Sequence, residues 1–128
     1  MAISDIGAAI VEKAKKEAAK HDSASFARYV HEIEPAAHHK LICSICDSVL
    51  YDLIERRKPR RVMILAPPGS AKSTYVTHNF ASFALGKIPS GYNIGVGTHT
   101  DDFSKDWSRR VRNTVTSERF QEVFPDVI

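Results

Sequence analysis

The stretch Arg61-Val-Met-Ile-Leu-Ala-Pro-Pro-Gly-Ser-Ala-Lys-Ser-Thr-Tyr75 decides the fold that we expect for this chain. It begins with a short apolar run, breaks at Pro67-Pro68-Gly69, and continues as a predicted helix from about Lys72. A buried strand, a tight turn and a helix N-terminus together bind phosphate, because the N–H groups of the turn and the positive end of the helix dipole face one anion. The stretch therefore predicts a phosphate-binding loop.

Two side chains of this loop have the expected chemistry. Lys72 would place its ammonium on the β- and γ-phosphates of a nucleotide, and Ser73 would offer its hydroxyl to Mg²⁺. This is the order of the Walker A motif, but alanine occupies both glycine positions, at residues 66 and 71. A left-handed backbone at Ala71 would cost about 1–2 kcal/mol. An ordinary strand–loop–helix connection with a solvated lysine is the competing interpretation.

The composition is that of an ordinary globular chain. It has 128 residues, 26% charged residues and a net charge of +3, which permits a nucleic-acid partner without requiring one. No apolar run reaches the roughly 18 residues of a membrane span, and the N-terminus lacks the apolar region of a signal peptide. Two cysteines do not make a disulfide framework. We therefore expect a cytoplasmic protein without a membrane segment.

Residues 1–57 are expected to form an all-helical N-terminal segment. Helical spacing of apolar residues predicts one helix from Ile3 to Lys20 and a short one, capped by Ser23 or Ser25, that ends at Pro35. A longer helix, from about Ala36 to Arg57, has a continuous apolar stripe.

One face of that longer helix presents three possible metal ligands. His39, Cys43 and Cys46 are spaced so that they could contribute to a zinc site. However, no fourth ligand is apparent, and both thiols lie in or beside the apolar stripe. We expect the two cysteines to be buried packing residues that bind no metal.

The chain after the loop predicts an α/β fold. A helix with an apolar face is followed by Gly86 and Pro89, and residues 92–98 have the composition of a second buried strand. Strand, helix and strand with short links form a parallel βαβ unit. Residues 58–128 are thus expected to be the first part of a P-loop ATPase domain, an incomplete P-loop NTPase core.

A further helix is predicted from Thr100 or Asp101 to about Ser117, with four apolar residues on its core face. They are Phe103, Trp107, Val111 and Val115. Arg110 falls at the edge of that face and would need a partner, whereas Lys105, Arg109 and Arg112 point outward. A last helical turn is predicted at residues 118–123, before Pro125.

Taken together, residues 25–128 resemble the N-terminal part of a bacteriophage terminase large subunit. The resemblance rests on the order and spacing of several short segments. They are Phe26, Glu34-Pro35 with His38-His39, Lys58 to Thr74, Leu85 to Pro89, Thr98 to Thr100, Trp107 to Arg112, and Val123 to Pro125.

The resemblance implies an ATP-driven motor that translocates double-stranded DNA into a viral capsid in the cytoplasm of a bacterial host. The family works as a ring on the portal protein, with a small terminase subunit, and its large subunit also has a C-terminal nuclease. ATP and Mg²⁺ are the implied cofactors. Matching positions give a catalytic role to Lys72, Arg109 and Arg112, and an Mg²⁺ contact to Ser73. The implied nucleotide-binding residues are Gly69, Ser70, Ala71, Lys72, Ser73, Thr74 and, on the adenine side, His39 or His38.

The sequence departs from the family pattern in three ways. The segment Gly69-Ser70-Ala71 contains no arginine, the acidic Walker B strand is absent, and there is no nuclease domain. We therefore expect a fragment that binds Mg-nucleotide weakly at most, has negligible turnover and tends to aggregate. The alternatives are a fragment of a P-loop nucleotide or small-molecule kinase, and a prophage remnant without enzymatic activity.

Overall fold

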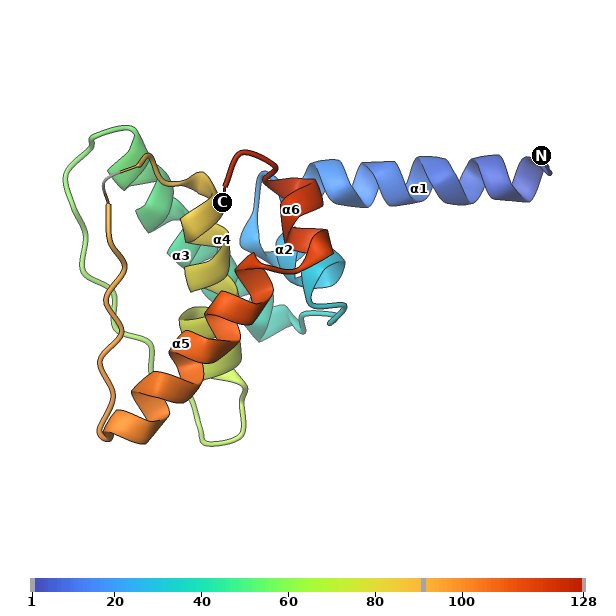
Figure 1. The fold of residues 1–128 in the computed structure, drawn as a ribbon. Coiled ribbons are helices and arrows are strands. Elements are labelled where there is room, and N and C mark those ends of the chain that lie inside the picture. Colours follow the sequence, from blue (N-terminus) through green and yellow to red (C-terminus); the bar gives the residue numbers. More distant parts are fainter. Residues whose placement is uncertain (1, 91, 128) are drawn as a thin grey trace.

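The computed structural model describes residues 2–90 and 92–127, and within them the chain is helical, with no strand (Figure 1). The elements, in chain order, are α1 (Ile3–Ala19), α2 (Ser23–Val30), α3 (Ala37–Ile54), the π-helical η1 (Thr74–Phe80), α4 (Ala81–Lys87), α5 (Asp101–Val115) and α6 (Glu118–Val123). The predicted α/β fold with a parallel βαβ unit is therefore wrong for this structure, whereas the helical N-terminal segment is confirmed.

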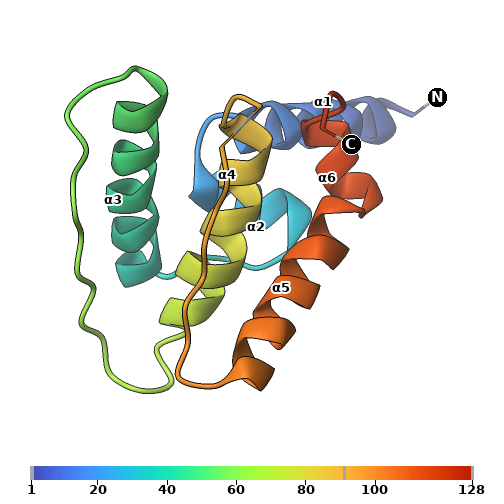
Figure 2. The same ribbon diagram turned by 60° about the vertical axis from the view of Figure 1, so that its left-hand side comes forward.

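The two predicted strands are extended segments without a partner. Residues 61–66 and 92–98 form no backbone–backbone hydrogen bonds in the described part of the chain. Figure 2 shows them running well apart, with α3 between them in this view. Apolar composition makes a segment suitable for a sheet, but a strand forms only when a neighbour supplies the matching backbone donors and acceptors. Their apolar side chains consequently stay exposed, with Met63 83% and Leu65 87% accessible.

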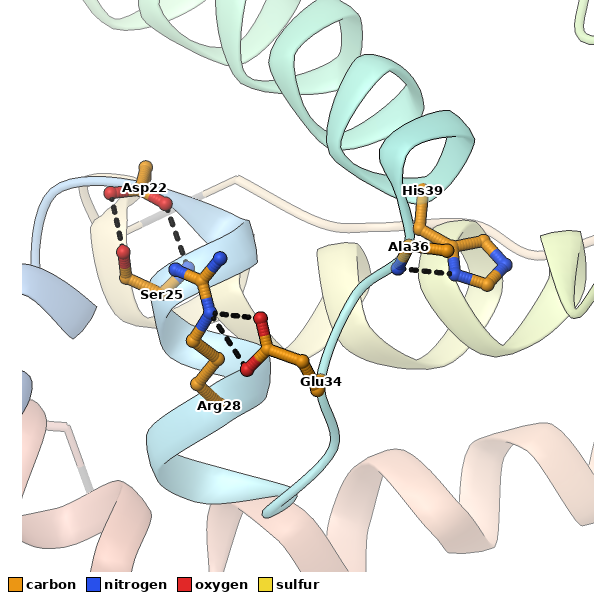
Figure 3. A network of polar contacts seen from close by, with 6 residues as sticks. All are labelled: Asp22, Ser25, Arg28, Glu34, Ala36 and His39. Atoms are coloured by element: carbon orange, nitrogen blue, oxygen red, sulfur yellow. Dashed lines mark hydrogen bonds and ion pairs between the residues drawn. The ribbon is translucent and has the colours of Figure 1, made fainter.

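Side-chain caps set several helix boundaries. Asp22, rather than either predicted serine, caps α2 by accepting a 2.7 Å hydrogen bond from Ser25 N (Figure 3). Thr100 caps α5 and Ser117 caps α6 in the same way, with side-chain oxygens that accept backbone N–H groups.

The core lies where α2, α4 and α6 meet, and it is aromatic. Phe26, Phe83 and Phe120 are completely buried, and Phe124 is 8% exposed. The ring of Phe26 lies 5.6 Å from that of Phe83 and 6.0 Å from that of Phe120, centroid to centroid. This core is built from helices at both ends of the chain, so the C-terminal helix is an integral part of the fold.

The predicted core face of α5 is only partly correct. Trp107, Val111 and Val115 are half-buried, but Phe103 is 51% exposed and lies beside the ring of His99. Thr114 is the residue of α5 that is buried. Arg110 has the partner that its position demanded, since its Nε donates to Asp106 at 3.0 Å.

Both cysteines are buried in α3, as predicted. Cys43 is 2% exposed and Cys46 is 7% exposed, and both are free thiols. Burial raises the pKa of Cys43 and raises that of Cys46 to about 11. Because the thiolate is the nucleophile, both groups are held in their unreactive form near neutral pH.

This burial predicts slow alkylation in the native protein. With iodoacetamide at about pH 8, we expect both thiols to react at least about tenfold more slowly in the folded chain than in urea, because the thiolate is scarce and shielded. Mass spectrometry over time measures the modification. Rapid native labelling of either cysteine, at the rate of the unfolded chain, would contradict the assignment as packing residues.

None of the helices in the described residues is both long enough and apolar enough to cross a membrane.

Candidate phosphate-binding loop

The candidate site is the segment 66–73, which joins an extended segment to a helical run. The helical run begins at Lys72, in agreement with the prediction that this lysine lies in the first helical turn. Ser70 N donates to Pro67 O at 3.3 Å, which closes the turn, and Tyr75 N donates to Ala71 O at 3.2 Å, which starts the helix. The predicted strand before the loop is extended but unpaired.

Two residues of the turn have a left-handed backbone. Gly69 has φ of 80° and Ala71 has φ of 60°. The left-handed conformation at residue 71 is the one for which the Walker A pattern places glycine, and alanine adopts it here at a cost of about 1–2 kcal/mol. Left-handed residues in a turn aim successive N–H groups toward one side, as in the backbone concavities that bind anions.

Lys72 folds back over this turn. Its Nζ donates to Ala66 O at 3.3 Å, so the ammonium lies across the mouth of the loop. Ser70 Oγ is buried and has no hydrogen-bond partner among the described residues. The loop therefore presents one cation and one unsatisfied hydroxyl close to the start of a helix.

His39 fixes the loop to α3. Its Nε2 lies 2.7 Å from Ser70 O, and its Nδ1 accepts a 3.2 Å hydrogen bond from Ala36 N, as Figure 3 shows for the second contact. Because Nδ1 is an acceptor, the proton is on Nε2, which donates to the Ser70 carbonyl. The ring also stacks on Tyr75, with 4.1 Å between centroids and 19° between planes. His39 thus contacts the loop itself, a contact that the sequence did not indicate.

The segment before α3 is also fixed. Arg28 Nε donates to both carboxylate oxygens of Glu34, at 3.1 and 3.2 Å (Figure 3). This exposed ion pair connects the segment before α3 with α2, and the Ala36–His39 contact caps the start of α3 itself.

A hollow of about 760 Å³ lies between this loop, residues 62–65 and the first half of α3. Its lining is mainly apolar, and His38 and His39 are its titratable side chains in the described part. No carboxylate lines it there, and neither do Lys72 and Ser73, so this hollow lies on the side of the loop that faces His38 and His39.

The predicted site residues fall into two groups. Gly69, Ser70, Ala71, Lys72, Ser73, Thr74 and His39 are brought together at the loop. Arg109 and Arg112 line a different hollow, between α4, α5 and the extended residues Ile94 and Val96. Arg109 Nη1 lies 3.7 Å from Asp106, within its own helix. No arginine lines the hollow at the loop within the described residues.

The two polar contacts of His39 can be separated by substitution. In His39→Gln, the side-chain amide reaches the position of Nε2 and can still donate to Ser70 O. In His39→Asn, the shorter amide reaches only the position of Nδ1. One hydrogen bond contributes about 0.5–1.5 kcal/mol, so we expect amide exchange in residues 66–73 to be about twofold to tenfold faster in His39→Asn than in His39→Gln.

Hydrogen-exchange mass spectrometry on peptides that cover the loop measures this difference. Peptides from α5 serve as the internal control and should exchange equally in both variants. Equal exchange of the loop in the two variants would show that the His39–Ser70 contact does not hold it.

No family model, curated protein or solved structure matches this chain in the comparisons made. The resemblance to terminase large subunits therefore stays a prediction from the sequence.

Proposed function

We propose that residues 66–73 bind the phosphate groups of ATP together with Mg²⁺, and that the chain is part of a terminase large subunit. In that role it belongs to the motor that packages double-stranded DNA, with a portal protein and a small terminase subunit as partners. Phosphate binding at this loop does not require the βαβ unit, which is absent from the described residues. It requires the turn and the helical run that follows.

The observation that carries the proposal is the position of Lys72. It opens a helical run directly after the left-handed Ala71, and its ammonium lies over the loop at Ala66 O. A phosphate would replace that carbonyl as the acceptor for the ammonium, which is favourable because hydrogen bonds to charged groups are stronger than neutral ones. The free N–H groups of the first helical turn and Ser70 Oγ would supply further donors.

Hydrolysis is not expected from this arrangement. Phosphoryl transfer in P-loop enzymes uses a carboxylate on the Mg²⁺ side and an arginine that neutralises the transition-state charge. The sequence has no acidic Walker B strand, and Arg109 and Arg112 line a hollow to which neither Lys72 nor Ser73 contributes. We therefore propose weak Mg-nucleotide binding without turnover by this chain.

Equilibrium titration with a fluorescent ATP analogue and Mg²⁺ tests the proposal. We expect Lys72→Ala to weaken binding at least about tenfold, since one charge-assisted hydrogen bond contributes about 1.5–3 kcal/mol. Lys58→Ala, an exposed lysine on the segment before the loop, is the matched control and should bind like the parent chain. Equal affinity of the parent and Lys72→Ala would refute phosphate binding at this loop.

Steady-state ATP hydrolysis by the same proteins tests the proposal that this chain does not turn over ATP. Turnover by the parent chain that disappears in Lys72→Ala would show that the missing carboxylate is supplied elsewhere and that the account of an incomplete site is wrong.

A further inference from the structure

Polar side chains and the backbone N–H and C=O of Ser23 form one hydrogen-bonded chain through the helical body, separate from the loop. It connects α3, α2, η1 and α5, so it crosses four elements. We call it the polar chain; its members, in order, are Asp47, Ser23, Asn79, His31, Thr114 and His78. Ser23, Asp47, Asn79 and Thr114 are buried, and His31 and His78 are half-buried.

The first half of the polar chain has fixed donors. Ser23 N donates to Asp47 Oδ2 at 2.9 Å, and Asn79 Nδ2 donates to Ser23 O at 2.9 Å. The amide of Asn79 is thereby oriented, because its nitrogen must face the Ser23 carbonyl. Its Oδ1 then faces His31 Nδ1 at 3.0 Å and can only accept.

That orientation determines the tautomers of both histidines. The proton of neutral His31 is on Nδ1, so its Nε2 is an acceptor. Thr114 Oγ1 lies 3.2 Å away, and its one proton can be donated to this nitrogen or to Arg110 O at 3.1 Å. The hydroxyl has only one proton, so His78 Nε2, at 2.8 Å from the same oxygen, must donate to it. With both rings neutral, each contact between these side chains has one donor and one acceptor when the Thr114 hydroxyl donates to His31.

An added proton changes the charge of this network rather than the number of its hydrogen bonds. Protonated His31 would donate from Nε2 to Thr114 Oγ1, and the hydroxyl would donate to Arg110 O, with which it already makes a 3.1 Å hydrogen bond. The charge would be unfavourable there, because the half-buried His31 ring lies between the His78 ring, 4.5 Å away, and the buried Phe26 ring, 5.6 Å away between centroids.

The charged groups around His31 and His78 do not offset the cost of a positive charge on either ring. From α5, Arg110 faces the same hollow as both histidines, and its Nε is already paired with Asp106. From α3, Asp47 reaches His31 only through Ser23 and Asn79. Burial, with a smaller contribution from His78, lowers the pKa of His31 to about 4, and burial with the charge of Arg110 lowers the pKa of His78.

We infer that His31, His78 and Thr114 form an acid-sensitive latch that holds α5 against α2 and η1 and releases it when an imidazole is protonated. Since the folded state keeps these imidazoles neutral, the latch is fully closed above their unfolded pKa of about 6.5. It weakens as the pH falls from there toward about 4. The pKa of Asp47 is raised by burial, so its protonation at low pH favours the folded chain and opposes the release.

Local hydrogen exchange tests the latch. At about pH 7 and about pH 5, with exchange corrected for its intrinsic pH dependence, we expect residues 101–115 to lose protection at least about tenfold while residues 37–54 keep theirs. Trp107 is the single tryptophan and lies on α5, with its ring centroid 6.5 Å from that of His78, so its fluorescence follows the same event. A loss of protection that is equal in α3 and α5 would indicate global acid unfolding and overturn the latch.

Variants identify the groups that titrate. The double variant His31→Gln with His78→Gln should lose the pH-dependent change in Trp107 fluorescence, because glutamine stays neutral. His21→Gln, which alters an exposed histidine after α1, is the matched control and should keep it. An unchanged pH profile in the double variant would overturn the assignment.

The tautomers provide a test that needs no variant. Imidazole ¹⁵N shifts of the native protein near neutral pH should show the Nδ1–H form for His31 and the Nε2–H form for His78. The opposite tautomer at either ring would contradict the directions of the hydrogen bonds on which the latch depends.

Discussion

Replacing Phe26 with alanine is expected to lower the free energy of unfolding by about 3–5 kcal/mol, because a completely buried aromatic ring is removed. Phe26 is on α2, and its ring contacts rings from α4 and from the C-terminal part of the chain. The remaining cavity would be bounded by three elements that already pack on one another, so it cannot collapse easily. At the lower end of this range the loss is still a large part of the stability of a small domain, about 5–15 kcal/mol.

Urea unfolding followed by far-UV circular dichroism measures this loss. Phe103→Ala is the matched control, because the same residue type is changed at a position that is 51% exposed. We expect the control to change the unfolding free energy by no more than about 0.5 kcal/mol, as surface substitutions usually do. Similar losses in the two variants would mean that the aromatic cluster is not the core of the protein.

Asn79→Leu is expected to cost about 2–5 kcal/mol, although leucine is similar in size and more apolar. The substitution removes the donor to Ser23 O and the acceptor for His31 Nδ1, and both partners remain in the protein interior. A buried polar group left without a partner costs about 1–3 kcal/mol, and two such groups remain here. The apolar gain is smaller than this because Asn79 is already completely buried and close-packed.

The same urea measurement applies, with Asn93→Leu as the control at an exposed position of the extended segment. The control should leave the unfolding free energy nearly unchanged. A loss below about 1 kcal/mol for Asn79→Leu would show that water replaces the amide, and that the polar chain is not sealed from solvent.

The helices could be predicted from the sequence because the signals that define them are local. Apolar periodicity placed α1, α3 and α5 within a few residues of their observed bounds. The strands could not be predicted in the same way. Residues 61–66 and 92–98 have strand-like composition, but whether they pair depends on which segments lie beside them, and composition does not contain that information.

In the candidate site too, local features could be predicted from the sequence and contacts between distant residues could not. The turn at Gly69 and the start of the helical run at Lys72 followed from the local sequence. The contact between His39 and Ser70 joins residues 31 positions apart, and the contact between His31 and Thr114 joins residues 83 positions apart. No periodicity or motif marks such pairs, because they arise only when separate helices pack together.

The first helix gives the molecule an unusual shape. Only the last turns of α1 pack on the body, with Ala19 in the core, and residues 2–15 are exposed (Figure 1). At 1.5 Å per residue, its 17 residues form a rod about 25 Å long. A rod fixed at one end makes rotational diffusion anisotropic, so amides in α1 and amides in helices that lie across it would differ in ¹⁵N relaxation even if all were equally rigid. The chain would also elute from a sizing column earlier than a compact sphere of its mass, 14.3 kDa, without any association.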